Sequence, residues 1–589
     1  MSSSPVPNAG GAGGERPAQT IARITLAGFD TFYGEFHTIT RAARRWFDAR
    51  EWMRVHDLHR ERIDLYQRHV VRTLATLRPI TQAYPEDHAL WRAAHTCFAE
   101  LVRGRIDFEV AETFFNAITR KIFRTMGVNR EIEFLGSDLD TQVGVPAPGR
   151  FRRIAGGGDP VELFASVLSH PRPALAWHDL RGDAQWLAAR FAEFRERGSL
   201  HEIEHIDVLK PLFFRAREAY VVGRVLAQGQ LHPLVIPVQP TASGVVVDGA
   251  LFDLDSTLQV FSSTRSYFFV DVQRPADLVR FLGSLMPQLT ESERYIAIAH
   301  HRHGKTLIHR ELVEHLQQSD DEFAIAPGIP GLVMTVFTLP SYRNVFKIVR
   351  DRFDKPGATR EAIMRSYRDV FRGRRTGRLA DTQEFEHLAF ARSRFSPECL
   401  AELTARAGNS VRVEGDRVVI SHLYIEAKMT PLNLYLARAS EDEAVGALID
   451  YGEAIKELAT NNIFAGDLLW KNFGVTHNGR LVLYDFDEIC PLLDCNFRRI
   501  PPPRSHEDEF SDVPYYAVGD ADVFPEEWAP FIAPRAPARL REVFMAHHGD
   551  LFDPEFWRSK QAEVVAGELH IGLPYASRHP VVPRARPAQ

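Results

Sequence analysis

Cysteine is scarce in this chain of 589 residues, with only four, at positions 97, 399, 490 and 495. Cysteines scattered over a long chain do not make the disulfide framework of a small secreted domain. Cys490 and Cys495 are close together, but no second Cys or His pair stands at the spacing of a zinc site. The cysteine content therefore argues against a fold stabilised by disulfides or by zinc.

Long apolar runs are missing too, because no segment approaches the roughly eighteen apolar residues that a membrane span requires. Residues 1–20 are rich in Gly, Ala, Ser and Pro, and they lack the basic start and apolar run of a secretory signal. They predict a disordered leader and a soluble, cytoplasmic protein with no membrane partner. A net charge of only -6 gives no support to nucleic-acid binding.

Lysine is the scarce cation, since only nine of the 71 basic residues are Lys. Lys is a compact point charge, whereas Arg is a planar fork, so the two do not replace each other at a phosphate. Each Lys is therefore a candidate for a specific role, and Lys347 and Lys471 stand where a phosphate-facing ammonium would be needed.

The length predicts two or more domains. Residues 21–320 are expected to be mainly helical, with strand-like patches at 245–252 and 267–272. Near Phe323 the pattern changes to a strand-rich piece followed by a helix-rich piece, which indicates a two-lobed α+β domain over 321–578. Its predicted strands are 332–339, 345–349, 411–413 and 418–425, and residues 579–589 are expected to be a frayed tail.

The candidate chemistry starts at Asp467 and Asn472, whose spacing of five is that of the base and the metal-binding Asn in a kinase catalytic loop. Asn478-Gly479 between two apolar runs predicts a hairpin in which both turn residues have positive φ. Asp485 follows the second strand directly. Any one of these Asp residues is more simply read as a solvated turn residue. Three such groups in this order around a hairpin favour phosphoryl transfer.

Phosphoryl transfer is catalysed mainly by positioning and by neutralising phosphate charge. Asp485 and Asn472 offer oxygen ligands for Mg²⁺ or Mn²⁺, and Asp467 can accept the proton of an attacking hydroxyl.

A nucleotide-binding lobe should precede this loop. The candidate phosphate cover is a glycine-containing turn made of Ala326, Pro327, Gly328, Ile329, Pro330, Gly331 and Leu332. Lys347 follows on the next strand, where it faces away from its apolar neighbours. Glu426 ends a strand that enters a hinge, where backbone groups could form hydrogen bonds with the edge of an adenine. The alternative is an ordinary turn with a surface Lys, because the turn is not a full G-x-G-x-x-G.

Several other patterns favour structural explanations. Gly304-Lys305-Thr306 lacks the earlier Gly of a Walker A loop, and His300, His301 and His303 are best explained as a solvated polar turn. Asp381 followed by Glu384 has the form of a helix N-cap, although Glu384 or Glu386 on that helix is also a candidate partner for Lys347. Ser440 with Glu443 predicts a capping box that opens a long helix.

These segments resemble the bacterial isocitrate dehydrogenase kinase/phosphatase family over nearly the whole chain. The matching stretches include Ala326 to Gly331, Val345-Phe346-Lys347, Ala380 to Phe385, His422 to Glu426, Lys471 to Gly474 and Ile500-Pro501-Pro502-Pro503-Arg504. The motifs Ala-Asp-Thr-Gln-Glu-Phe and Ile-Pro-Pro-Pro-Arg are not general kinase motifs.

The resemblance implies a helical regulatory domain and a protein-kinase-like domain in a bifunctional enzyme. Such an enzyme phosphorylates a serine of NADP-dependent isocitrate dehydrogenase, which is inactivated, and removes the phosphate again, switching carbon between the citric acid cycle and the glyoxylate bypass. It uses ATP and Mg²⁺, requires ADP or ATP for dephosphorylation, and responds to AMP as an allosteric effector. The resemblance assigns Ala326 to Leu332 and Lys347 to ATP and gives Asp381 a part in the phosphatase direction.

The chain also departs from ordinary kinases. Ala465-Gly466 replaces the usual His-Arg, Lys471 lies four rather than two residues after Asp467, and Asp487 replaces the last Gly of Asp-Phe-Gly, which adds a metal ligand. No Ser or Thr occurs from Asp485 to Arg504, which disfavours control by phosphorylation there. An aminoglycoside-type kinase and a catalytically inactive nucleotide sensor stay open as alternatives, as does a homodimeric state.

Overall fold

The computed structural model describes residues 16–136, 151–170, 173, 175–198, 203–262, 264–265, 267–355, 357–372, 377–503, 515–528, 537–566, 573, 575 and 577–579. Most of the predicted leader and nearly all of the predicted tail lie outside these residues. The first helix begins at Pro17, four residues before the predicted start of the first domain. Among the described helices, none combines the length and the apolar character that crossing a bilayer requires.

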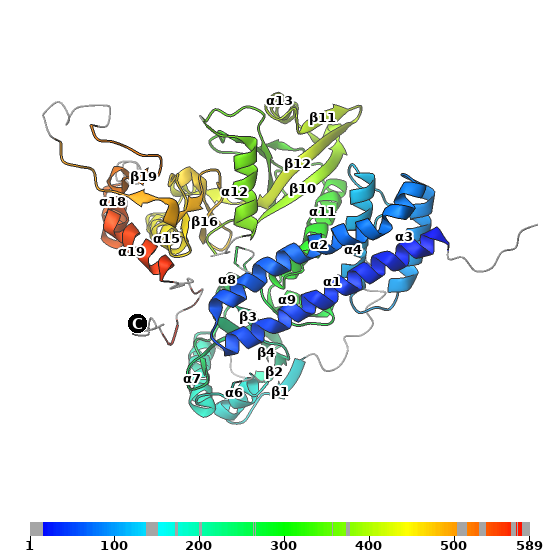
Figure 1. Ribbon diagram of the computed structural model, residues 1–589. Coiled ribbons are helices and arrows are strands. Elements are labelled where there is room, and N and C mark those ends of the chain that lie inside the picture. Colours follow the sequence, from blue (N-terminus) through cyan, green and yellow to red (C-terminus); the bar gives the residue numbers. More distant parts are fainter. Residues whose placement is uncertain are drawn as a thin grey trace, which may run out of the picture.

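Four helices open the chain: α1 (Pro17–Asp48), α2 (Trp52–Ala83), α3 (His88–Val102) and α4 (Phe108–Phe123). In Figure 1, α1 and α2 are the long blue helices that lie side by side through the middle of the molecule. The apolar residues of α1 recur every three or four positions, so Phe29, Phe32 and Phe36 are all buried on one face. Phe114 of α4 packs against two of these rings.

An antiparallel sheet follows, which the sequence analysis largely missed. Its elements are β1 (Phe151–Ala155), α6 (Pro160–Leu168), α7 (Leu180–Gly198), β2 (Ile203–Leu209), β3 (Phe213–Arg215), β4 (Glu218–Ala227), β5 (Gln230–Pro240) and β6 (Val245–Val247). The strand order is β1-β2-β4-β5-β6, with β3 beside β4. Gln228 and Gly229 join β4 to β5 and both have positive φ, as a two-residue hairpin requires.

Of the two strand patches predicted in this region, one contains a strand and the other does not. The patch at 245–252 contains β6, whereas 267–272 forms no named strand and makes only an isolated bridge from Phe269 to Phe214. Strands β4 and β5 escaped prediction because most of their residues are buried on both faces of the sheet. A strand buried on both faces loses the alternation of polar and apolar residues that identifies a strand in sequence.

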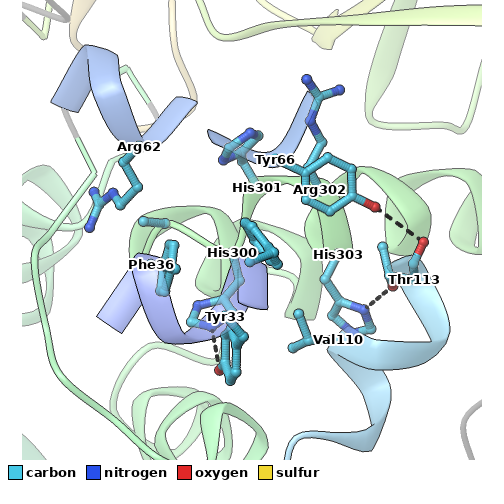
Figure 2. A pocket seen from close by; sticks show the side chains of 12 residues that line it. Tyr33, Phe36, Arg62, Tyr66, Val110, Thr113, His300, His301, Arg302 and His303 are labelled. Carbon is cyan, nitrogen blue, oxygen red and sulfur yellow. Dashed lines mark hydrogen bonds between the residues drawn. The ribbon is translucent and has the colours of Figure 1, made fainter. Parts of the chain in front are cut away.

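Helices α8 (Leu254–Val260), α9 (Pro275–Leu285), α10 (Glu291–Ala297) and α11 (His301–Gln318) complete the first region. The prediction of a solvated histidine turn is wrong, since His300, His301 and His303 are all buried at the start of α11. Figure 2 shows them around a cavity of about 20 Å³, with His300 bonded to the Tyr33 hydroxyl at 3.1 Å and His303 to Thr113 at 2.7 Å. Burial lowers the pKa of His300 to about 3, so its ring is neutral.

The small lobe of the second region contains β7 (Ala324–Ile325), β8 (Met334–Thr338), β9 (Asn344–Val349), α12 (Arg360–Arg372), β10 (Thr382–Ala391), η1 (Arg392–Arg394), α13 (Pro397–Arg406), β11 (Val411–Glu414) and β12 (Arg417–Ala427). Its antiparallel sheet has the order β10-β12-β9-β8-β7, with β11 beside β12. All four strands predicted from sequence in this lobe are confirmed. Strand β10 was instead expected to be a helix.

The large lobe is mostly helical. Its elements are β13 (Thr430–Pro431), α14 (Leu432–Leu436), α15 (Glu441–Thr460), β14 (Ile463–Phe464), η2 (Trp470–Asn472), β15 (Phe473–Val475), β16 (Leu481–Leu483), β17 (Cys490–Pro491), η3 (Leu492–Asp494), β18 (Asn496–Phe497), β19 (Asp522–Val523), η4 (Pro525–Trp528), α18 (Ala538–His548), η5 (Gly549–Phe552) and α19 (Pro554–Val565). The predicted capping box of Ser440 and Glu443 is confirmed at the start of α15. The α+β, two-lobed architecture is confirmed as well.

The buried side chains form three clusters that do not coincide with the domain boundary near residue 320. One cluster runs from α1 and α4 through the first sheet into the small lobe, where it includes Phe337, Phe346 and Phe385. A second joins the large lobe, with Tyr451 and Phe473, to the small lobe, with Tyr367 of α12 and Tyr424 of β12. The third lies between the first sheet and helices α8 to α10. The small lobe is therefore packed on the helical region, as Figure 1 shows where β10 and β12 lie beside α11.

Candidate active site

The loop that carries Asp467 lies between β14 and η2. Gly466 has φ +69, and a Cβ built on it would lie 2.5 Å from the carbonyl oxygen of Glu488, so this position needs a glycine. The Asp467 carboxylate accepts a hydrogen bond from the Leu469 amide at 2.9 Å. The side-chain amide of Asn472 donates to the Asp467 carbonyl at 3.3 Å. The two residues that the sequence paired by spacing are therefore in contact.

The predicted hairpin follows directly, although its turn differs from the prediction. Strands β15 and β16 pair with Val475 opposite Leu481. Gly479 has positive φ, but Asn478 does not appear among the residues with that backbone conformation. The Gly479 amide donates to the Thr476 carbonyl at 2.9 Å. The connection is thus a type I turn with a glycine bulge rather than a two-residue turn with two positive φ values.

Two carboxylates, Asp485 and Asp487, follow β16. The Tyr484 amide donates to the Asn472 carbonyl at 3.1 Å, which holds this segment against the catalytic loop. Burial, together with the neighbouring Asp487, raises the pKa of Asp485 to about 8. Burial acts in the same direction on Asp487, but hydrogen bonds from Asp485 and Lys355 lower the pKa of that carboxyl. The pair therefore carries one shared proton over a wide range of pH.

Lys355 is a site residue that the sequence analysis did not single out. Its ammonium lies 2.8 Å from Asp487 and 2.5 Å from Glu488, and it comes from the loop after β9 in the opposite lobe. The scarcity of lysine, which drew attention to Lys347 and Lys471, was a signal that applied equally to Lys355. Its contact with Asp487 was not detectable, because 132 residues separate the two.

Lys347 on β9 forms a buried ion pair with Glu426 on β12, at 2.7 Å. The same ammonium donates to the Tyr484 carbonyl at 2.8 Å, which brings it next to Asp485. The second oxygen of Glu426 accepts from the Thr382 hydroxyl at 2.6 Å. Glu426 thus contacts Lys347 through its side chain. The contact predicted from sequence is a different one, between the backbone of this strand and an adenine.

Neither Glu384 nor Glu386, the two predicted candidates, pairs with Lys347. Both lie on strand β10 rather than on a helix, so the N-cap interpretation of Asp381 is wrong as well. Glu384 bonds His422 at 2.8 Å, and Glu386 lies 3.5 Å from Lys121. The polar and apolar residues of this segment suited a capped helix locally, but the long pairing with β12 decides for a strand.

Asp381 nevertheless lies at the site. Leu379 bridges Leu483 in parallel, and the Ala380 amide donates to the Leu483 carbonyl at 2.9 Å. Two residues further along these adjacent segments stand Asp381 and Asp485. The Gln383 amide holds the Asp381 carboxylate at 2.9 Å.

The glycine-containing turn joins β7 to β8 at the edge of the small lobe. Gly328 has φ +130, which excludes most other residues. Ile329 and Leu332 are exposed, at 62% and 45%. The turn is therefore exposed at the edge of the sheet that carries Lys347. Lys471 lies in η2, where its carbonyl accepts from the Tyr484 hydroxyl.

The donor set suits a magnesium nucleotide. Mg²⁺ is usually held by one or two carboxylates and completed by phosphate oxygens and water. Among the described residues, no three His, Cys, Asp or Glu side chains group as a metal site. Asp485, Asp487 and the amide oxygen of Asn472 would supply the protein ligands. Burial raises the pKa of Asp485, and a bound cation would lower it.

Two family models match the chain. The isocitrate dehydrogenase kinase/phosphatase (AceK) regulatory domain matches residues 22–320, and the isocitrate dehydrogenase kinase/phosphatase (AceK) kinase domain matches residues 321–577.

Curated relatives are similar over nearly the whole length. The isocitrate dehydrogenase kinase/phosphatase of Anaeromyxobacter sp. (strain Fw109-5) is 41% identical over 95% of this chain and 97% of its own. The proteins of the same name from Polaromonas sp. and Bordetella bronchiseptica are each 38% identical, over 95% and 96% of this chain and 92% and 96% of their own. Among solved structures, the ROP18 kinase domain in complex with AMP-PNP and sucrose matches 44% of this chain and 93% of its own, at 11% identity and a TM-score of 0.21.

Proposed function

The chain belongs to the isocitrate dehydrogenase kinase/phosphatase family, and we propose that it phosphorylates isocitrate dehydrogenase with ATP and removes that phosphate again at one site between its lobes. Family membership supports both activities and the protein substrate. The assignment of individual residues is our proposal from the geometry.

Asp467 is the proposed base of the kinase reaction. The Leu469 amide and the short η2 turn orient its carboxylate, and Asn472 ties the loop to it. A carboxylate held in this way can accept the proton of a substrate hydroxyl as that oxygen attacks phosphorus. The substrate hydroxyl is proposed to be a serine, and Lys471 is proposed to assist from the same loop.

Lys347 is the proposed phosphate-pairing cation. Its buried pair with Glu426 and its bond to the Tyr484 carbonyl fix the ammonium beside Asp485. Ala326 to Leu332 would cover the nucleotide, and Asp485, Asp487 and Asn472 would hold Mg²⁺ or Mn²⁺. When bound, the metal neutralises charge on the phosphates. The convergence of Lys347, Asn472 and Asp485 around Tyr484 is the single observation that carries the proposal.

Asp381 is the proposed acid of the phosphatase direction. It follows the bridge between Leu379 and Leu483 by two residues, as Asp485 does, and its carboxylate accepts from Gln383. We propose that from this position it orients a water towards a bound phosphate. ADP or ATP is expected to be required, since both directions use one nucleotide site. AMP as an allosteric effector and a role in directing carbon to the glyoxylate bypass belong to the same proposal.

The test is an assay of isocitrate dehydrogenase activity with the wild type, Asp467→Ala and Asp381→Ala, first with ATP and then with ADP. Wild type should inactivate the substrate enzyme and then reactivate it. In Asp467→Ala the kinase rate should fall by about 10²–10⁴-fold, while nucleotide binding is retained. Asp381→Ala should retain inactivation and lose reactivation.

Two outcomes would contradict the proposal. If no phosphate becomes attached to isocitrate dehydrogenase while ATP is consumed with a small alcohol, the chain is a small-molecule kinase. If Asp467→Ala retains full regulation of isocitrate dehydrogenase, the chain acts as a nucleotide sensor without catalysis.

A further inference from the structure

Two thiols lie close together directly after the paired acids of the site. The sulfur atoms of Cys490 and Cys495 are 3.6 Å apart, and neither side chain is fully buried. A disulfide bond is about 2.05 Å long, so the sulfurs need to approach by only about 1.5 Å. Rotation of the two side chains, together with a small shift of the backbone that carries them, can supply this.

The backbone around these thiols is held at both ends. Cys490 pairs with Phe464 between β17 and β14. The side-chain amide of Gln561 on α19 donates to the carbonyls of Leu492 and Cys495, at 2.9 and 2.7 Å. Asn462 accepts from the Leu493 amide at 3.0 Å. The thiols are therefore presented to each other by a fixed loop.

Cys399 has different surroundings from this pair. Cys399 on α13 is fully buried, and burial raises the pKa of its thiol to about 12. By contrast, the hydrogen bond from Cys495 lowers the pKa of Cys490, against the effect of burial. A thiolate is the reactive form of cysteine, so Cys490 is the better nucleophile.

We propose that Cys490 and Cys495 form a reversible disulfide when the protein meets a peroxide. The Cys490 thiolate attacks one peroxide oxygen, the O–O bond breaks, and a sulfenic acid and hydroxide result. The Cys495 sulfur then attacks the Cys490 sulfur, the S–O bond breaks, and hydroxide leaves as the disulfide forms. The two thiols lose two electrons and two protons, and the peroxide is reduced to two molecules of water. A small dithiol then reduces the disulfide to two thiols by exchange and is itself oxidised to a disulfide.

This bond lies where it can reach the catalytic loop. Cys490 is paired with Phe464, two residues before Gly466, and the Glu488 carbonyl packs directly on Gly466. Closing the disulfide pulls on the same strand. Because a displacement of about 1 Å in a catalytic group costs up to about 10²-fold in rate, oxidation should slow phosphotransfer. This consequence rests on the proposed function.

Mass spectrometry of the full-length protein tests the bond itself. Trypsin cleaves after Arg480 and Arg498 and not between them, so one peptide carries both thiols. After treatment with hydrogen peroxide and alkylation in denaturant, this peptide should be unalkylated and two hydrogen atoms lighter than the dithiol, while Cys97 and Cys399 are alkylated. Dithiothreitol should restore alkylation of all four cysteines. Alkylation of both residues after peroxide, or a sulfinic acid on Cys490 beside a free Cys495, would overturn the proposal.

Matched variants complete the experiment. Cys399→Ser should form the same crosslink, and Cys495→Ser should form none. In the wild type, peroxide should lower phosphorylation of isocitrate dehydrogenase at least about tenfold, and dithiothreitol should restore it. A crosslink without a change of rate would overturn the coupling to the loop. A reduced enzyme that never phosphorylates isocitrate dehydrogenase would refute the proposed function, and the peptide masses would still decide the disulfide.

Discussion

Asp485 shows how one residue relates stability to function. It is buried beside a second carboxyl and close to the ammonium of Lys347, so its pKa is raised to about 8. A metal ion binds the ionised carboxylate, whereas the folded protein without a metal favours the protonated acid. The same burial that prepares the group for a cation therefore makes it costly to keep ionised.

The first prediction concerns pH. Because the ionised form of Asp485 is the metal ligand, kcat/KM for the magnesium nucleotide should rise by up to about tenfold per pH unit from pH 6 and level off near pH 8. Kinase assays at saturating isocitrate dehydrogenase across this range measure it. A profile that is flat between pH 6 and pH 8 contradicts this reading of the acid pair.

The second prediction concerns Asp485→Asn. An acid whose pKa is raised in the folded state loses stabilising free energy as pH rises from its ordinary value near 4 to its folded value near 8. The Asn side chain does not ionise, so the variant should not lose this free energy as pH rises. The variant should have no kinase activity. Its melting temperature should exceed that of the wild type, by more at pH 8.5 than at pH 5. Thermal unfolding of both proteins at pH 5 and pH 8.5 measures this. If the difference in melting temperature is the same at the two pH values, or has the opposite sign, the prediction is wrong.

At the scale of the element, helix α15 positions both halves of the active loop. The Tyr451 hydroxyl donates to the Leu468 carbonyl, next to Asp467. The neighbouring Asp450 accepts from the Leu481 amide at 2.7 Å, at the start of β16. Successive residues of one helix thus hold the catalytic loop and the hairpin strand that leads to Asp485. The capping box of Ser440 fixes where this helix begins.

The third prediction compares two glycines near this helix. Gly466→Ala should lower the free energy of unfolding by about 1–3 kcal/mol, because Ala is strained at φ +69 and its Cβ meets the Glu488 carbonyl. It should also reduce kinase activity at least about tenfold. Gly446→Ala lies within α15, where an added Cβ meets nothing, and should stabilise the fold by up to about 1 kcal/mol without loss of activity. Denaturant unfolding and kinase assays measure both. If the two changes have equal effects, neither the positive φ nor the close contact with Glu488 requires a glycine at position 466.

At the scale of the whole molecule, the last described residues of the chain, 575 and 577–579, contact the first region next to its sheet. Buried Asp248 accepts hydrogen bonds from Ser577 at 2.7 Å, from Tyr575 at 3.0 Å and from the His579 amide at 3.0 Å. Arg578 donates to Asp183 at α7. The large lobe is therefore attached to the helical region through its C-terminal residues, while the small lobe is attached through a shared apolar core.

The fourth prediction tests this attachment. Asp248→Asn leaves several donors facing a group with fewer acceptor sites, so the variant should lose about 1–3 kcal/mol of unfolding free energy. Limited proteolysis should also cut the C-terminal residues faster. Asp255→Asn, an exposed acid on α8, is the matched control and should change neither. Unchanged proteolysis of Asp248→Asn would mean that the contacts of Asp248 do not hold residues 575–579 in place.

The sequence alone determined what depends on neighbouring residues. The spacing of Asp467 and Asn472, the capping box at Ser440 and four strands of the small lobe follow from local backbone preferences, and the structure agrees with them. The hairpin of β15 and β16 forms as predicted, but its turn has positive φ at Gly479 and not at Asn478. Family motifs added the enzyme class.

Tertiary structure alone decided which distant groups meet. Lys347 pairs with Glu426 rather than with Glu384, and Lys355 reaches Asp487 across the lobes. Asp381 directly precedes strand β10 instead of capping a helix. It also buried the histidines of α11 and paired strands that have no alternating pattern. These outcomes depend on packing between segments tens to hundreds of residues apart, where burial and strand pairing outweigh local propensity.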